Sequence, residues 1–318
     1  MIRKIQNQFT VAQVARMAGV DRRMLTDLEK DGQFPAARRN ESNHRIYTFA
    51  EARTIVRHLA GPQARRIAVV NQKGGVGKTT TTFNLAGALA ARGRSVLLID
   101  LDPQANLTSS VGVELSDHDI SVEEVFIDDD LAAERTVLET PIPGISIIPA
   151  RPRLAGVEVK IFDGFLRETI LDRKLEPLHG QYDCILIDCP PNLSLVTINA
   201  LVACTEAIVP IEAQTYSIRA VSDVTNTVAL IRSRLGRGVT LRFLPTKIDA
   251  RLKVAAEILE AVKRGLKDRV LPHIRTDSHL IRAPMMRTPV GLCFPHSKGA
   301  RDYAVLADTL LRNPPTDA

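Results

Sequence analysis

Short apolar runs alternate with longer amphipathic stretches along most of the chain. The runs predict strands at Arg66–Asn71, Ser95–Asp100, Gly144–Pro149, Cys184–Asp188, Glu206–Ile211 and Arg242–Thr246, with a short late strand at Pro289-Val290. The amphipathic stretches predict helices at Thr79–Arg92, Phe162–Leu178, from about Ser194, and at Ile218–Leu235, Leu252–Leu266 and Ala300–Leu311, with helix and loop at Ser121–Leu138. Such alternation predicts an α/β fold with a mostly parallel sheet covered by helices on both faces.

The first 60 residues have a different pattern and predict a small separate domain. Phe9–Leu28 has helical spacing interrupted at Gly19, which predicts two short helices joined by a tight turn. An extended stretch at Arg45–Tyr47 follows, and then a helix that Thr48 can cap. The chain divides near Gly61-Pro62, so we expect a helical domain at residues 1–60, a linker at 61–65 and the α/β domain at 66–318.

Composition narrows the class of protein. The 318 residues are 45% hydrophobic and 25% charged, which is typical of a folded globular protein and excludes a largely disordered chain. No apolar run is long enough for a membrane helix, and the first ten residues, MIRKIQNQFT, lack the apolar core of a secretion signal. The four cysteines show no metal-ligand or CxxC spacing. We therefore expect a cytoplasmic protein with reduced, mostly buried thiols.

Charge is distributed in three blocks. Residues 1–64 carry 11 Lys/Arg against 6 Asp/Glu, residues 65–218 carry 13 against 21, and residues 219–318 carry 18 against 9. The net charges of these blocks are +5, −8 and +9. Basic ends around an acidic middle favour a polyanionic partner such as nucleic acid at the ends, although a solvated basic surface is the alternative.

The strongest chemical signal is the run Asn71–Thr80, NQKGGVGKTT, between a predicted strand and a predicted helix. Glycines let backbone N–H groups curl around phosphate oxygens, and the helix N-terminus faces the anion. Lys78 would contact the β- and γ-phosphates and Thr79 would offer its hydroxyl to Mg²⁺. The alternative is a glycine-rich turn with an incidental Lys-Thr pair.

The motif departs from the general phosphate-loop pattern, because Gln72 stands where that pattern has glycine and Lys73 follows it. The resulting KGGVGKT resembles the deviant loop of the ParA/MinD family of ATPases. Four other stretches are similar to that family: Leu97–Asn106 (LLIDLDPQAN), Tyr182–Pro191 (YDCILIDCPP), Pro245–Arg251 (PTKIDAR) and Ser297–Tyr303 (SKGARDY). The resemblance covers about residues 65–311 and implies a P-loop NTPase fold.

Three aspartates follow predicted strands. Asp100 and Asp102 lie two residues apart, so strand alternation places both on one side at the carboxyl edge of the sheet. The resemblance implies that Asp102 positions the attacking water, that Asp100 helps to order Mg²⁺, and that Asp188 holds Mg²⁺. A helix cap beside a solvated carboxylate is the alternative for the first pair.

The resemblance also implies the remaining nucleotide contacts. Lys73 would reach into the nucleotide of a partner subunit, which makes ATP the link of a homodimer, although a local phosphate contact is the alternative. The expected catalytic residues are thus Lys73, Lys78 and Asp102, with Thr79, Asp100 and Asp188 at the metal. The expected nucleotide-binding set is Lys73, Gly74, Gly75, Val76, Gly77, Lys78, Thr79, Thr80, Thr246, Lys247 and Asp249. Thr246–Asp249 is similar to a guanine-binding NKxD motif, but the family uses ATP; GTP is the lesser alternative.

The N-terminal domain resembles the winged helix-turn-helix of MerR-type DNA-binding proteins. The matching residues run from Phe9 through Gly19-Val20 to Arg22-Arg23, with His44–Tyr47 as the wing. Arg22, Arg23 and Thr26 are candidates for the major groove, and Arg38, Arg39 and Arg45 for backbone phosphates. The chain lacks the coiled coil and effector domain that follow in MerR proteins. A docking or dimerisation module is the alternative.

The second basic block has a different expected role. ParA proteins bind DNA without sequence preference through C-terminal basic residues, and the candidates here are Arg219, Arg275, Arg282 and Arg287. His279 stands where relatives place arginine. The C-terminal Leu310–Pro315 is unsuited to the membrane helix of MinD, and Cys184 and Cys189 flank a strand instead of bridging a cluster as in nitrogenase-type iron proteins.

The resemblance therefore implies a ParA-type ATPase for plasmid or chromosome partition. ATP would drive dimerisation and nonspecific DNA binding on the nucleoid, a ParB-like partner would stimulate slow hydrolysis, and the N-terminal domain would bind the operator of its own operon. A nucleotide-switched transcription regulator and a ParA-like ATPase that positions a protein cluster are the alternatives.

Overall fold

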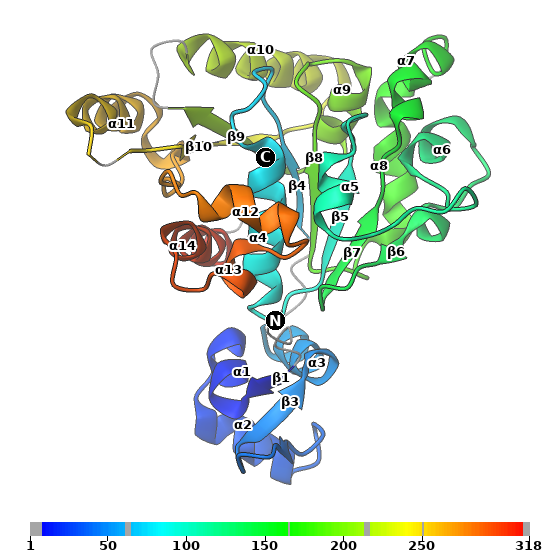
Figure 1. Ribbon diagram of the computed structural model, residues 1–318. Helices are drawn as coiled ribbons and strands as arrows, with labels where there is room; N and C mark the ends of the chain where they lie inside the picture. Colours follow the sequence, from blue (N-terminus) through cyan, green and yellow to red (C-terminus); the bar gives the residue numbers. More distant parts are fainter. Residues whose placement is uncertain (1–7, 61–64, 165, 213–216, 250, 314–318) are drawn as a thin grey trace.

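The computed structural model describes residues 8–60, 65–164, 166–212, 217–249 and 251–313. Figure 1 shows a large α/β body with a smaller N-terminal lobe beneath it. None of the helices in these ranges combines the length and apolar content needed to cross a lipid bilayer.

The large body is built on a seven-stranded sheet. Its spatial order is β10 (Thr240–Thr246), β9 (Glu206–Glu212), β4 (Arg65–Val69), β8 (Cys184–Asp188), β5 (Val96–Asp100), β7 (Ile145–Ile148) and β6 (Leu138–Glu139). Every neighbouring pair is parallel except β6 with β7. The predicted mostly parallel sheet is therefore confirmed, and the carboxyl ends of β4, β8 and β5 meet at one edge.

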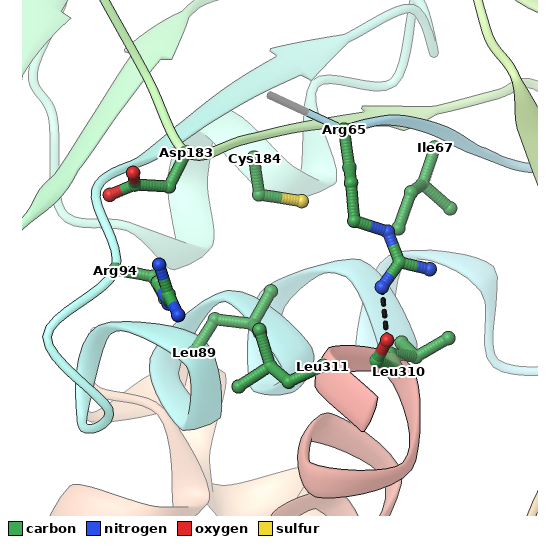
Figure 2. A pocket seen from close by; sticks show the side chains of 8 residues that line it. All are labelled: Arg65, Ile67, Leu89, Arg94, Asp183, Cys184, Leu310 and Leu311. Atoms are coloured by element: carbon green, nitrogen blue, oxygen red, sulfur yellow. Dashed lines mark hydrogen bonds between the residues drawn. The ribbon is translucent and has the colours of Figure 1, made fainter. Parts of the chain in front are cut away.

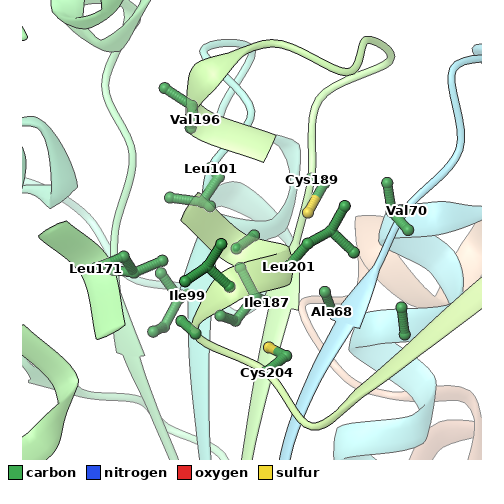
Figure 3. Packing of buried hydrophobic residues seen from close by; sticks show 14 of the residues in the cluster. Ala68, Val70, Ile99, Leu101, Leu171, Ile187, Cys189, Val196, Leu201 and Cys204 are labelled. Carbon is green, nitrogen blue, oxygen red and sulfur yellow. The ribbon is translucent and has the colours of Figure 1, made fainter. Parts of the chain in front are cut away.

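Strand alternation divides the core into two halves. Ile67 and Val69 of β4 pack into the cluster on one face of the sheet, and Ala68 into the cluster on the other. Figure 3 shows the second cluster, where Ile99 and Ile187 meet residues of the covering helices. Both faces are thus closed, as expected for a parallel sheet.

Helices cover the two faces. The first face carries α4 (Lys78–Ala90), α5 (Asn106–Ser110), α12 (His279–Met285), α13 (Val290–Cys293) and α14 (Lys298–Arg312). The second carries α6 (Val122–Ile127), α7 (Val157–Lys160), α8 (Ile170–Leu175), α9 (Leu195–Val202) and α10 (Ser217–Leu235), while α11 (Lys253–Leu266) lies beyond β10 (Figure 1). Short 3-10 helices occur at Ala133–Thr136, Pro152–Gly156, Arg167–Thr169, Glu176–Leu178 and Lys267–Arg269.

The N-terminal lobe has its own core. It contains β1 (Gln8–Thr10), α1 (Val11–Ala18), α2 (Arg22–Lys30), β2 (Arg38–Arg39), β3 (Arg45–Thr48) and α3 (Phe49–Ala60), with an antiparallel sheet ordered β1-β3-β2. Thr10 and Gln13 form a capping box at the start of α1, and Gly19 ends that helix with a φ of 69°. The turn between α1 and α2 therefore needs glycine, as the sequence pattern predicted.

Two predicted elements differ from the structure. Pro289-Val290 is no strand: Pro289 precedes α13, and the Val290 N–H donates to the Asn84 side chain 2.8 Å away. The predicted helix Phe162–Leu178 is broken into shorter pieces, because Leu166 takes a left-handed φ of 55° that a helix cannot continue through.

The two lobes touch through α3. Arg53 and Arg57 donate to the backbone carbonyls of Gln181 and Gly180, in the turn that leads into β8. On the same side the Phe49 ring covers Gly144, where any side chain would overlap it. The small lobe therefore rests on the amino edge of the sheet, opposite the edge where β4, β5 and β8 end.

Candidate phosphate site and DNA-binding surfaces

The loop between β4 and α4 is shaped by its glycines and by one asparagine. Gly75 and Gly77 have φ values of 72° and 96°, which side-chain-bearing residues rarely adopt. Asn71 anchors the loop: its side chain accepts from Lys73 N at 2.9 Å and donates to the Pro210 carbonyl at 2.6 Å. The sequence pattern does not reveal this role of Asn71, because its partner Pro210 is far away in sequence.

Lys78 crosses the mouth of this loop. It is the first residue of α4, is only 7% exposed, and donates from Nζ to the Lys73 carbonyl at 3.2 Å. Burial lowers the pKa of Lys78, while the negative charge of Asp188 opposes that shift. A buried cation beside a glycine-rich loop at a helix N-terminus is suited to phosphate oxygens.

Two buried aspartates lie beside the loop. Asp100 and Asp188 end adjacent strands in register, and both are fully buried. Burial raises the pKa of Asp100 to about 6, and burial together with the charge of Asp100 raises the pKa of Asp188. Two neighbouring buried carboxylates repel each other, and the single charge of Lys78 offsets only part of this repulsion. A divalent cation would relieve the rest.

The hydrogen bonds of these aspartates separate their roles. Asp188 accepts from the Thr79 hydroxyl at 2.6 Å and from the Thr82 hydroxyl at 3.3 Å. Asp100 accepts from the backbone N–H and the hydroxyl of Thr108, at 2.9 and 2.8 Å, and from Asp102 N. The Thr79 hydroxyl and the Asp188 carboxylate are the hard oxygen ligands that Mg²⁺ takes from proteins, so these residues fit that ion. The geometry of Asp100 is that of a residue that positions the loop after β5.

Asp102 lies just beyond this pair and is partly exposed. Its backbone N–H donates to Asp100, and its carboxylate accepts from Gln104 N at 3.0 Å. Its charge acts on both Lys78 and Asp188. The structure thus brings the predicted Lys78, Thr79, Asp100, Asp102 and Asp188 to one place.

Lys73 lies at the rim of the loop and is held there by an acidic residue. Its Nζ is 2.6 Å from one oxygen of Glu212, and Lys247 Nζ is 2.6 Å from the other. Burial raises the pKa of Glu212, but the hydrogen bonds from the two lysines outweigh it and leave the pKa below its ordinary value. Glu212 ends β9 and was not recognised from the sequence, since no motif contains it.

The remaining predicted nucleotide residues are divided between two environments. Gly74, Val76 and Thr80 belong to the loop and the first turn of α4, and the Thr246 hydroxyl donates to the Val76 carbonyl at 2.9 Å. Asp249 instead forms an ion pair with Arg251 at 2.6 Å, which lowers its pKa to about 2. A base-recognition role for Thr246, Lys247 and Asp249 stays a prediction.

The predicted DNA-binding residues of the N-terminal lobe lie at the start of α2. Arg22 and Arg23 are exposed, and Thr26 follows one turn later with its hydroxyl bonded to the Arg22 carbonyl. Arg38 pairs with Glu51, and Arg39 bonds to Asn43. These five side chains stay predictions as DNA contacts.

Arg45 has a structural partner that the sequence did not reveal. It contacts Glu29, which is 8% exposed and also accepts from Tyr47 Oη at 2.6 Å and Ala37 N at 2.7 Å. Glu29 therefore ties α2 to the segment before β2 and to β3. No local pattern marks a glutamate on a polar helix as the centre of such a network.

The C-terminal candidates are also partly engaged. Arg275 makes a two-pronged ion pair with Asp302, Arg282 lies over the Phe294 ring at 5.2 Å, and Arg287 pairs with Glu114 at 2.9 Å. His279 bonds to Asp277 at 2.7 Å. The Arg219 side chain lies outside the described residues.

Comparisons with known proteins agree with both lobes. A family model described as AAA domain matches residues 64–241, and one described as MerR family regulatory protein matches residues 10–47. The sporulation initiation inhibitor protein Soj of Bacillus subtilis is 39% identical over 249 residues, covering 78% of this chain and 98% of Soj. The chromosome partitioning protein ParA of Myxococcus xanthus is 35% identical, covering 78% of this chain and 88% of that protein.

A solved structure has the same fold. It is the crystal structure of cobyrinic acid a,c-diamide synthase from Mycobacterium smegmatis with bound ATP analogue and magnesium. That protein is 35% identical, with a TM-score of 0.68, and the match covers 78% of this chain and 95% of that one.

Proposed function

The chain belongs to the ParA/Soj family of P-loop ATPases, and from that premise we propose that it uses ATP and Mg²⁺ to switch a DNA-binding dimer on and off during partition. The observation that carries this proposal is the 2.6 Å hydrogen bond from Thr79 to the buried Asp188, beside Lys78. It joins the start of the loop helix to the end of β8, where a nucleotide phosphate and a metal ion would meet.

We assign the residues of the site as follows. Lys78 and the loop amides bind the phosphates, Thr79 and Asp188 hold Mg²⁺, and Asp100 positions the segment after β5. Asp102, partly exposed at the mouth, orients the attacking water. Mg²⁺ would supply charge neutralisation on the phosphates, and a solved relative contains magnesium with an ATP analogue.

We propose Lys73 as the dimer contact. Its side chain is 48% exposed at the rim and is held by Glu212, so it can exchange that carboxylate for the phosphate of a nucleotide in a second subunit. Dimerisation would then depend on ATP, because ATP supplies the anion that bridges the subunits.

Two DNA-binding modes follow from the two basic regions. The block that contains Arg282 and Arg287 would bind DNA without sequence preference in the ATP dimer, through phosphates alone. Arg22 and Arg23 at the start of α2 would bind a specific operator. A ParB-like partner would stimulate hydrolysis and release the dimer from the nucleoid.

The test is binding of the full chain to random-sequence DNA without nucleotide, with ADP and with ATP, at two salt concentrations. Wild type should bind only with ATP, and the affinity should fall steeply as salt rises. Arg22→Ala with Arg23→Ala should leave this binding unchanged and abolish binding to the operator. If the double variant also loses random-DNA binding, the chain is a nucleotide-switched regulator instead.

Asp102→Ala separates binding from hydrolysis. This variant should bind ATP and dimerise, measured by light scattering, while releasing no phosphate. A variant that hydrolyses ATP at the wild-type rate would remove Asp102 from the mechanism.

A further inference from the structure

A cleft separates the N-terminal lobe from the α/β body, on the side away from the phosphate loop. Its walls come from α1, from the turn between α4 and β5, and from the end of α14. The cleft has a volume of about 620 Å³, which is within the range of small-ligand sites. Residues of both lobes therefore face one space.

The cleft has an excess of positive charge. Four arginines line it, Arg16, Arg92, Arg94 and Arg312, against the single carboxylate of Asp308. Arg92 takes up that carboxylate through two hydrogen bonds of 2.6 and 2.8 Å. Arg16 and Arg312 are exposed, so the excess is carried by these two and by Arg94.

Arg94 is the unusual member of this group. It is only 5% exposed, yet among the described residues its Nε and Nη1 atoms have no hydrogen-bond partner. Burial lowers the pKa of Arg94, and the negative charge of Asp183 opposes the shift. Arginine does not give up its proton in proteins, so the buried charge must be compensated by an anion or remain costly.

The nearest carboxylate is engaged elsewhere. Asp183 accepts from the backbone N–H and the hydroxyl of Ser95, at 2.8 and 3.0 Å, and Arg53 approaches it at 3.8 Å. Figure 2 shows the Asp183 carboxylate turned away from the small pocket that Arg94, Arg65 and Leu310 line. That pocket, about 10 Å³, is too small for any ligand larger than one water. Nε and Nη1 are closed off from solvent, so an anion in the larger cleft, which Arg94 also lines, would compensate the charge of the guanidinium without bonding to those two atoms.

We propose that the cleft between α1, the α4–β5 turn and α14 binds a small phosphate-bearing anion. A DNA duplex fits the cleft less well than a small molecule, because residues of both lobes wall it. The helix proposed to bind operator DNA, α2, lies on the far side of α1 from the α/β body (Figure 1). Guanidinium groups match phosphate oxygens in geometry and charge. Such an anion would join the DNA-binding lobe to the ATPase at a point remote from the phosphate loop.

The experiment is thermal unfolding of the full chain titrated with inorganic pyrophosphate, in saturating ADP and Mg²⁺. The phosphate loop is intact in every variant, so pyrophosphate bound there shifts every melting temperature equally. Differences in the shift between variants therefore report binding in the cleft. The variants are Arg94→Met, Arg16→Ala and, as a matched control, Arg264→Ala, an exposed arginine on α11.

Pyrophosphate should raise the melting temperature of wild type and of Arg264→Ala equally. Arg16→Ala should need about tenfold more pyrophosphate for the same rise. Arg94→Met should melt no lower than wild type without pyrophosphate, since it loses an uncompensated charge, and should lose the response to pyrophosphate.

Equal responses in all four chains, or none in wild type, would overturn the proposal. If Arg94→Met melts well below wild type whatever the anion, Arg94 is a structural residue, and the proposal then stands only if Arg16→Ala still weakens the response. The outcome is independent of ATPase activity.

Discussion

Strands β5 and β8 lie side by side, and their two ends bury opposite charges. At the carboxyl ends, Asp100 and Asp188 are adjacent and fully buried, and the pKa of each is raised, first of all by burial. At the amino ends, Arg94 is buried beside Asp183, and two of its nitrogens have no hydrogen-bond partner in the part of the chain that the structure describes. One end needs a cation and the other an anion. In both proposals a buried charge that is only partly compensated by the protein is the reason for placing a ligand there.

Glu29 of the N-terminal lobe is a contrasting case, a buried charge whose carboxylate accepts three hydrogen bonds. Glu29→Ala should lower the free energy of unfolding by about 3 kcal/mol, because it strands the Tyr47 hydroxyl and the Ala37 N–H. Glu29→Gln should cost less, since its amide oxygen can still accept. Chemical denaturation of the full chain, followed by circular dichroism, measures both.

The same residue gives a pH dependence. Burial raises the pKa of Glu29, but hydrogen bonds from Tyr47, Ala37 and Arg45 outweigh it and leave the pKa below 4.5. The stabilisation is therefore complete above about pH 4.5 and is lost as the pH falls through the folded-state pKa. Glu29→Gln should flatten this part of the stability profile; an unchanged profile would contradict the network.

At the carboxyl ends, the positive charge of Lys78 opposes the rise in the pKa of Asp188 and so stabilises the acidic pair. Lys78→Met keeps the apolar stem and removes the charge. We expect ATP affinity to fall about 100-fold, measured by calorimetry. Affinity within a factor of two of wild type would show that the loop binds phosphate by backbone amides alone.

At the amino ends, Asp183→Asn removes the carboxylate nearest to Arg94. It also weakens the two hydrogen bonds from Ser95. Unfolding free energy should fall by about 2 kcal/mol. Added pyrophosphate should recover part of this loss, because an anion in the cleft would compensate the charge of Arg94. The same melting temperature with and without pyrophosphate would contradict an anion site in the cleft.

The matching substitution at the other end should have the opposite sign. Asp188→Asn removes one of two buried like charges. In the absence of nucleotide and Mg²⁺ the free energy of unfolding should therefore rise by about 1 kcal/mol, which corresponds to a rise in melting temperature of about 2–4 °C. Thermal unfolding measures it, with Asp102→Asn as the partly exposed control. A loss as large as that of Asp183→Asn would mean that both ends are ordinary structural networks.

Local pattern was enough to predict the sheet and the loop. Cys184–Asp188 was predicted at its observed bounds, because a short apolar run between turns has few alternatives once its neighbours alternate with helices. Local pattern also placed Lys78 and Thr79 in a phosphate loop and Asp100 and Asp102 at the carboxyl edge of the sheet, whereas the role of Asp188 came from the resemblance to the family.

The features that the sequence pattern did not predict depend on contacts between segments that are far apart in the chain. Val290 forms a helix because Asn84, some two hundred residues earlier, accepts its N–H. Glu212 and Glu29 look like ordinary polar residues until folding places two lysines, or a tyrosine and an arginine, against them. Arg94 lies in the turn after α4, and the residues that line the small pocket with it include Leu310 and Leu311 of α14, which are far away in sequence.

The short connection between the lobes has a thermodynamic consequence. Only four residues separate the end of α3 from the start of β4, and four residues span at most about 14 Å. Each lobe therefore experiences the other at an effective concentration in the millimolar range or above. The contacts of Arg53 and Arg57 with two carbonyls therefore hold the lobes together more effectively than the same contacts would hold two separate proteins. A ligand that binds only the associated lobes, with a free energy little larger than that of one hydrogen bond, would shift the equilibrium between associated and separated lobes.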